Sequence, residues 1–324
     1  GRSYLGITQL FAASQAPPHL KAIFPEMYVF EWYPMIYPGG IFRDDFFGKW
    51  QQLTHQLDNS VAFEWGAMKF TGGAAPVDGP AGPTLRDSAI AEHRANRDML
   101  AMWRGVPFRT SVDPETGKQI HLERSPSTYL AAINASGIPV YGLVGWYDAF
   151  PRDALLWFRN LTVPQKLVIG PWFHSQTHGF DLGAERHRWM DRWLKNVDNG
   201  IDREPPIRYY VIDAPEGQEW RSATTWPLPG VTPTDFFFHR GRSGTAASFN
   251  DGILSRERPA DPESADSRTI DTTATLGPAN RWANTYGRET GYPDLAANDA
   301  KGFTWTSEPL AEPLEGIGHP IVHL

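Results

Sequence analysis

Two short apolar runs near the middle of the chain, IPVYGLVG and QKLVIG, lie on either side of the amphipathic stretch FPRDALLWFRNL. Strand-length apolar runs that alternate with a helical pattern are typical of parallel strands joined by a crossover helix. We therefore expect strands over residues 140–144 and 166–169, with a helix over residues 150–160 between them. This unit constrains the chain most, because a parallel pair needs helices on its faces and so predicts an α/β fold.

The sequence changes character on both sides of this unit. Before it, FRDDFFGKWQQLTHQLD and LRDSAIAEHRANRDMLAMW read as amphipathic helices joined by loops rich in Gly and Pro. Beyond Glu204 the helical patterns stop, and PIRYYVID, EWRSATTW and TDFFFHR read as strands between turns. The pattern predicts an α/β core over residues 1–26 and 124–203, an inserted helical segment over residues 27–123, and an antiparallel β-sandwich over residues 204–324.

The composition excludes several classes of function. The 324 residues are 41% hydrophobic and 21% charged, enough to bury at least one large core. The net charge is -7 and the Lys and Arg residues are scattered, which argues against a nucleic-acid partner. Zero cysteines exclude disulfides, thiolate zinc sites and cysteine nucleophiles. No apolar run of about 18 residues occurs, so the sequence predicts no membrane-spanning helix and no membrane partner.

The chain opens GRSYLG, a serine between glycines directly before a helical pattern that ends at Pro17. A sharp strand-to-helix turn of this kind presents the serine hydroxyl in serine hydrolases. The string is a weak signal by itself, because Gly and Ser are common in turns of every kind. Ser3 therefore becomes a candidate nucleophile only together with residues that follow.

Two polar residues come directly after the two apolar runs. Asp148 stands in GWYDAF and His174 in VIGPWFHS, each just past a predicted strand. The order serine, acid, histidine is that of an α/β-hydrolase triad, in which the acid and the base lie on loops after later strands. The alternatives are structural, with Asp148 capping the helix that follows it and His174 serving as an ordinary hydrogen-bonded histidine.

These three residue types suit acyl transfer. A serine hydroxyl is a poor nucleophile until a neutral imidazole takes its proton, so His174 would act as the base and then protonate the leaving group. Asp148 would hold the imidazole tautomer, and the backbone N–H of Tyr4 would donate to the oxyanion. This chemistry requires no cofactor and no metal.

Two other functions stay open from the residues alone. The thirteen tryptophans and the predicted sandwich also suit a carbohydrate-binding or glycoside-cleaving protein, with Asp87 and Asp98 as paired carboxylates. A metal hydrolase that uses His174 and His178 is the weaker alternative, because Pro171 indicates a loop where such a pair needs a helix.

The strings GRSYLG, GWYDAF and GPWFHS, followed by DRWLKNVDNGIDREPPIRYYVI and EWRSATTWPLPG, resemble the cocaine-esterase and X-Pro dipeptidyl-peptidase family of serine hydrolases. That family also includes α-amino-acid ester hydrolases and glutaryl-cephalosporin acylases, and the likeness covers nearly the whole chain. It implies an α/β hydrolase with an inserted helical cap and a C-terminal jelly roll. It also implies Ser3, Asp148 and His174 as nucleophile, acid and base, acting on small esters, amides or short peptides.

In this family the region before the nucleophile supplies the first strands of the central sheet and a tyrosine that is the second oxyanion donor. No such region precedes GRSYLG here, and the last residues, EGIGHPIVHL, look like a strand in mid-sequence. The resemblance therefore implies a fragment that lacks both ends, with an incomplete hydrolase sheet and a truncated jelly roll. Homo-oligomer formation is left open.

Trp146 and Phe150 flank Asp148 and are the predicted pocket residues, because large apolar side chains suit an acyl pocket. The alternative is that these aromatic side chains belong to the core. No carboxylate cluster stands out that would receive a substrate ammonium group, and Asp44 and Asp45 read as solvated surface.

Overall fold

The computed structural model describes residues 1–65, 68–70, 75–260, 265–275, 280–286, 291 and 294–324. The chain divides into two compact units, Gly1–Trp226 with Arg281–Glu289, and Pro227–Asn280 with Thr290–Leu324. Among the described residues, no helix combines the length and the apolar character that crossing a membrane requires.

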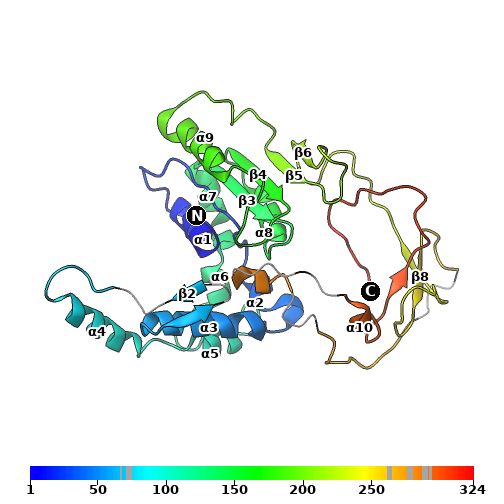
Figure 1. Ribbon diagram of the computed structural model, residues 1–324, viewed down its shortest axis with the longest axis horizontal. Helices are drawn as coiled ribbons and strands as arrows, with labels where there is room; N and C mark the ends of the chain where they lie inside the picture. Colours follow the sequence, from blue (N-terminus) through cyan, green and yellow to red (C-terminus); the bar gives the residue numbers. More distant parts are fainter. Residues whose placement is uncertain (66–67, 71–74, 261–264, 276–279, 287–290, 292–293) are drawn as a thin grey trace. The chain divides into compact units, whose positions relative to one another are not determined.

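The first unit is built around a four-stranded sheet in the order β3-β4-β5-β6 (Figure 1). Its strands are β3 (Val140–Gly145), β4 (Gln165–Gly170), β5 (Ile207–Tyr210) and β6 (Trp220–Ala223). The first three are parallel, and β6 runs antiparallel to β5. Both strands predicted from the apolar runs are confirmed, and every residue of β3 is buried.

β5 and β6 lie beyond residue 204, where the sequence predicts the β-sandwich to begin, and they pair with the sheet of the first unit. The Leu167 N–H of β4 donates to the Pro206 carbonyl at 2.7 Å, and Ile207 of β5 is fully buried. A short alternating strand looks the same in either sheet, because local pattern does not identify the partner strand. By strand pairing, the core of the first unit therefore extends to Trp226.

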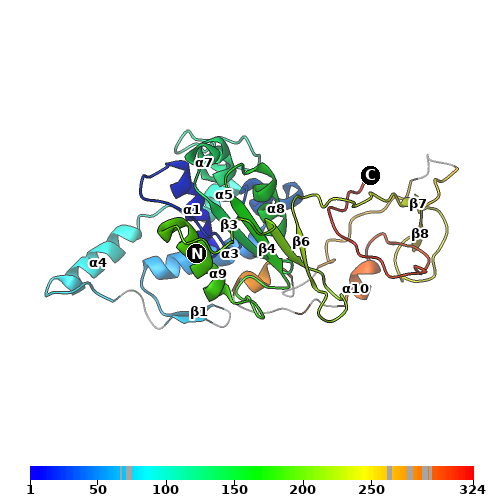
Figure 2. The same ribbon diagram turned by 90° about the horizontal axis from the view of Figure 1, so that it is seen from above.

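Helices α1 (Tyr4–Ser14), α7 (Leu130–Ser136), α8 (Pro151–Asn160) and α9 (Leu182–Lys195) pack around this sheet (Figure 1, Figure 2). α8 contacts both β3 and β4, and α1 packs against α7. α1 and α8 confirm the helices predicted after Ser3 and between the two apolar runs.

A short extended segment lies beside β3 and widens the sheet. Its residues Ile23 and Glu26 form parallel bridges with β3. Two buried tryptophans hold it: Trp157 of α8 donates its indole N–H to the Val29 carbonyl at 2.9 Å, and Trp189 of α9 donates to the Ile23 carbonyl at 3.1 Å. The sheet therefore continues up to the residues that precede the helical segment.

The helical segment follows. Its elements are α2 (Tyr33–Ile36), the 3₁₀ turn Pro38–Gly40, α3 (Asp44–Asp58), α4 (Gly82–His93), α5 (Met99–Arg104), α6 (Ile120–Arg124) and the 3₁₀ turn Pro126–Tyr129. The two amphipathic stretches form α3, α4 and α5, as predicted. An antiparallel pair, β1 (Phe63–Trp65) and β2 (Met68–Phe70), is an addition that the pattern does not predict. Met27 and Val29, at the predicted start of the helical segment, are fully buried.

The second unit contains a three-stranded sheet of β7 (Phe237–His239), β8 (Gly252–Ser255) and β9 (Trp305–Thr306), together with α10 (Ala296–Asp299). β8 is antiparallel to β7 and parallel to β9. Within the described residues of this unit, one sheet is present where a sandwich needs two. EGIGHPIVHL forms no strand there either, contrary to the expectation from sequence.

Gly145 and Gly170 stand opposite each other at the ends of β3 and β4, and the buried Trp172 fills the space over both. A Cβ on Gly145 would lie 2.0 Å from the Trp172 carbonyl oxygen. We expect Gly145→Ala to lower the free energy of unfolding by about 1–3 kcal/mol through overpacking, as measured by urea denaturation.

The matched control is Gly48→Ala in α3, where a new Cβ would meet only Asp44 at 3.8 Å. We expect this variant to match the wild type or to gain up to about 1 kcal/mol, because alanine favours a helix over glycine. Equal stability of the two variants would contradict the tight packing over the strand ends.

Candidate active site

Ser3 forms the turn that leads into α1. Its backbone has φ 57° and ψ -125°, a conformation that costs a residue with a side chain about 1–3 kcal/mol. A serine at this position usually caps the helix, yet the Ser3 hydroxyl makes no cap hydrogen bond. A strained serine turn whose hydroxyl does not cap the helix is the geometry of a nucleophile elbow.

The turn is held by Glu26, which is fully buried. The Glu26 carbonyl accepts the Ser3 N–H at 2.8 Å. Its carboxylate pairs with Arg186 of α9 and lies 3.3 Å from the Arg2 guanidinium. A Cβ on Gly6 would come within 3.0 Å of the Glu26 carbonyl oxygen, so the close approach of α1 depends on glycine there. Main-chain and side-chain contacts of one residue thus fix the turn.

Asp148 and His174 lie just past the ends of β3 and β4, which end level with each other in the sheet. Asp148 Oδ1 accepts from His174 Nδ1 at 2.8 Å and from the Ala149 N–H at 2.6 Å. Both side chains are buried. The N-cap residue of α8 is Phe150, so Asp148 is not the helix cap of the structural alternative. With Nδ1 bonded to the carboxylate, Nε2 is the nitrogen that can take a proton from a hydroxyl.

A small cavity of about 50 Å³ lies between the Ser3 turn and the loop that carries His174. Ser3, Phe150, His174 and Thr285 are among the residues that line it. The Phe150 ring lies 5.8 Å from the His174 imidazole, so this predicted pocket residue is at the site. Ser3 and His174 both line this cavity. Among the described residues, no hydrogen bond joins the two.

Tyr4 and Trp146, the other two residues predicted for the site, lie in different surroundings. Within the described part of the chain, the Tyr4 N–H in the first turn of α1 has no acceptor, which leaves it able to bind an oxyanion. Trp146 lines neither the small cavity nor the larger one described below. Its indole N–H donates to the Tyr210 carbonyl of β5 at 2.7 Å, so it packs against the sheet and the prediction for Trp146 is not supported.

Sequence reasoning missed one residue of the site, Asn284, which is 1% exposed. It lies in the 3₁₀ turn Ala283–Tyr286, far along the chain from both loops that it contacts. Its Oδ1 accepts the backbone N–H of His174 at 3.1 Å, and its Nδ2 donates to the Tyr147 carbonyl at 2.8 Å. An isolated asparagine between loops carries no local signal that would have marked it.

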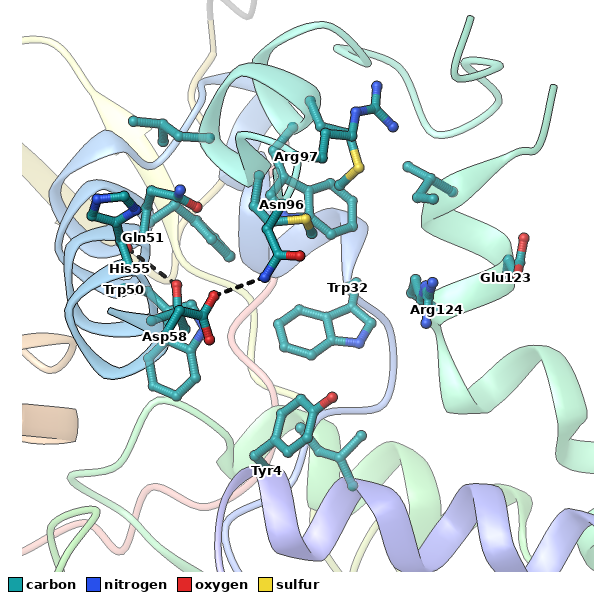
Figure 3. Close-up of a pocket in the computed structure, with 18 of the residues that line it drawn as sticks. Tyr4, Trp32, Trp50, Gln51, His55, Asp58, Asn96, Arg97, Glu123 and Arg124 are labelled. Carbon is teal, nitrogen blue, oxygen red and sulfur yellow. Dashed lines mark hydrogen bonds between the residues drawn. The ribbon is translucent and has the colours of Figure 1, made fainter. Parts of the chain in front are cut away.

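A larger cavity of about 820 Å³ adjoins the small one and is lined from α1, α3, α5 and α6 (Figure 3). The two cavities share the lining residues Tyr4, Ile7, Trp32, Phe47 and Trp50. Figure 3 shows Tyr4 and Trp32 facing the same space as the side chains of α3. Large cavities lined by aromatic and apolar side chains suit the apolar part of a small-molecule substrate.

Two carboxylates at the wall of the larger cavity already have partners. Asp58 accepts from Asn96 Nδ2 at 3.1 Å (Figure 3), and Glu123 lies 2.9 Å from Lys118 Nζ. A substrate ammonium group would have to displace these contacts.

The carboxylates of the glycoside alternative have local roles. Asp98 caps α5 by accepting the Ala101 N–H at 3.0 Å, and Asp87 pairs with its neighbour Arg86 at 2.9 Å. Neither residue lines the two cavities. In the part of the chain that the structure describes, no group of three or more His, Cys, Asp or Glu side chains is arranged to hold a metal ion.

Comparison with known proteins gives two matches along the chain. Residues 1–176 match the X-Pro dipeptidyl-peptidase (S15) family, and residues 199–324 match the X-Pro dipeptidyl-peptidase C-terminal non-catalytic domain. The second match begins before β5, although β5 and β6 pair with the sheet of the first unit.

Individual relatives agree with these matches. A Mycobacterium bovis protein named as a serine esterase is 31% identical over all of this chain and 55% of its own length. Cocaine esterase from Rhodococcus sp. is 27% identical over 84% of this chain and 49% of its own. The chain thus spans about half the length of the curated relatives it matches. A solved CocE/NonD family hydrolase from Staphylococcus aureus has a TM-score of 0.54 at 19% identity, covering 79% of this chain and 38% of that one, and shows an α/β-hydrolase type of fold.

A second carboxyl lies close to the site, because Asp153 is on the buried side of α8 and accepts the Phe30 N–H at 2.7 Å. Burial raises the pKa of Asp153 from 3.8 to about 7, and the nearby charge of Asp148 acts in the same direction. Between these values the folded state keeps a proton that the unfolded state releases, so this group's contribution to stability falls as pH rises.

We therefore expect the unfolding free energy of the wild type, relative to Asp153→Asn, to fall between pH 4 and pH 7 and to level off above that range. The slope is at most about 1.4 kcal/mol per pH unit. Urea denaturation across this range measures the difference. Asp202→Asn is the control: a hydrogen bond from Arg192 lowers the pKa of Asp202, so its difference should stay flat over the same range. A flat difference for Asp153→Asn would show that this carboxyl does not titrate there.

Proposed function

Because the chain belongs to the X-Pro dipeptidyl-peptidase (S15) family, we propose that it is a serine hydrolase with Ser3, Asp148 and His174 as its catalytic triad. One observation carries the assignment. Asp148 and His174 are hydrogen-bonded at 2.8 Å beside a cavity that the strained Ser3 turn also lines. A buried carboxylate on Nδ1 and a serine near the other side of the imidazole are what acyl transfer requires.

In the proposed reaction Ser3 Oγ attacks the carbonyl carbon of the substrate while His174 Nε2 takes the hydroxyl proton. The imidazolium that forms is stabilised by Asp148, and it then gives the proton to the leaving alcohol or amine. In the second half of the reaction His174 Nε2 takes a proton from water as the water oxygen attacks the acyl carbon, and it returns the proton to Ser3 Oγ as the carboxylic acid leaves. Ser3 and His174 would come into hydrogen-bond contact when substrate binds, since such contacts are often loose without ligand.

The oxyanion of the tetrahedral intermediate needs donors aimed at it. We assign the Tyr4 backbone N–H as one of them, because it follows the nucleophile directly and stands at the N-terminal end of α1, where the helix dipole also favours negative charge. Tyr4 is the first of the 11 residues of this helix, which keeps the donor in a fixed position.

We assign the larger cavity to the rest of the substrate and helices α2 to α6 to a cap over the serine. Phe47 and Trp50 of α3 support this, since they line both cavities and so connect the nucleophile to the larger space. The substrates would be esters or amides, short X-Pro peptides included, with an apolar group of moderate size. We assign the unit beyond Trp226 to a C-terminal non-catalytic domain, because residues 199–324 match one.

The triad is tested with a fluorophosphonate probe and with a short p-nitrophenyl ester. We expect Ser3→Ala to lose labelling altogether, and Asp148→Asn or His174→Gln to lower the rate of ester hydrolysis by about 10³-fold or more. Ser14→Ala, at the other end of α1, is the matched serine control and should be labelled like the wild type. Labelling of Ser3→Ala at the wild-type rate would refute the assignment of the nucleophile.

The role of the larger cavity is tested on α3. Thr54 lines the cavity and Leu57, three residues on, does not. We expect Thr54→Trp to lower kcat/KM for a bulky aromatic ester by about tenfold while that for an acetyl ester changes little, because it fills the space needed only by the bulky group. Leu57→Trp should affect neither ester. Equal losses with both esters in Thr54→Trp would count against the cavity as the substrate site.

A further inference from the structure

The amide of Asn284 joins the two loops that carry Asp148 and His174. One side of the amide accepts from the main chain of His174 itself, and the other donates to the main chain of Tyr147, the residue before Asp148. The direct bond between Asp148 and His174 completes a closed ring of hydrogen bonds. The acid and the base are thus linked twice, once through their side chains and once through their backbones.

Only an uncharged amide meets both demands at this position. A backbone N–H can only donate and a carbonyl can only accept, so the partners fix which way the amide points. A carboxylate would place a negative oxygen against the Tyr147 carbonyl, and an aliphatic side chain would leave both buried main-chain groups without this partner. The near-complete burial of Asn284 makes either change costly.

The turn that carries Asn284 is itself anchored at the site. The Trp282 ring packs edge-on against Phe46 at 5.5 Å and Phe150 at 6.1 Å, and the Arg43 guanidinium lies 4.3 Å above its centre. Thr285, the residue after Asn284, lines the small cavity. The amide is therefore presented from a packed support rather than from a loose end.

We propose that Asn284 is a positioning residue that holds the acid loop and the base loop in register, so that the His174 imidazole keeps its bond to Asp148. This rests on the proposed triad. Asn284 does not touch the reacting atoms, and its effect reaches them through the orientation of the imidazole. Small misplacements of a catalytic group are enough to lower rates by about 100-fold.

The test compares Asn284→Ala and Asn284→Asp with a matched amide elsewhere in the same unit. Asn134 makes the same two kinds of bond, donating to the Asn160 carbonyl at 3.0 Å and accepting the Thr162 N–H at 2.9 Å, and it lies outside the site. We expect both Asn284 variants to lower kcat for a short p-nitrophenyl ester by about 10- to 100-fold with little change in KM. Asn134→Ala should lose stability without this loss of kcat.

A second readout does not depend on turnover. The Nδ1 proton that His174 donates to a buried carboxylate should give a low-field proton NMR signal, identified by its absence in His174→Gln. We expect this signal to broaden or vanish in Asn284→Ala and to persist in Asn134→Ala.

The outcomes separate the two proposals. If Ser3→Ala is labelled like the wild type, the triad is wrong whatever Asn284 does. If the triad holds but folded Asn284→Ala keeps the wild-type kcat and the His174 signal, Asn284 is only a structural residue and the inference is overturned. If Asn284→Asp does not fold, Asn284→Ala decides by the same two readouts.

Discussion

The parallel register of β3 and β4 is the constraint on which the site depends. It pairs Gly145 with Gly170, so the two strands end at the same level, and the chain then carries Asp148 and His174 out of the sheet side by side. Trp172 packs over both glycines, which leaves no room for larger residues at these strand ends. The 2.8 Å bond between acid and base is thus a consequence of sheet geometry rather than of loop conformation alone.

The Ser3 turn is held at the same edge of the sheet by a separate set of contacts. Ser3 adopts a backbone conformation that a free peptide avoids, and contacts with the surrounding structure must offset its free-energy cost. Glu26 does so in two ways, because its carbonyl binds the Ser3 N–H and its buried carboxylate pairs with Arg186 of α9. Because the Glu26 carboxylate is fully buried, removing Arg186 would leave a buried charge with fewer partners, so α9 and the Ser3 turn depend on each other although they are far apart in sequence.

Residue patterns within short stretches of the sequence were enough to predict several of the strands and helices. The apolar runs predicted β3 and β4, helical spacing predicted α1, α3 and α8, and the residues just past the strands included Asp148 and His174. The pairing of strands could not be predicted in this way: β5 and β6 carry an alternating pattern that fits any half-buried strand, and they belong to the first sheet because β5 pairs with β4 and β6 pairs with β5. Trp146 illustrates the same limit, since proximity to Asp148 in sequence does not say on which side of the strand end the indole lies. Asn284 could not be found at all, because its two partners come from distant loops.

The residues proposed for catalysis and most of those proposed to bind the substrate lie on different elements. Asp148, His174 and the Ser3 turn are fixed by the sheet and by buried hydrogen bonds, whereas most of the larger cavity is lined by the helical segment. Phe47 and Trp50 connect the two regions, because they line both the small cavity beside Ser3 and the larger cavity. Under the proposed function, changes in α3 or α5 would therefore alter which substrate fits without disturbing the bond between Asp148 and His174.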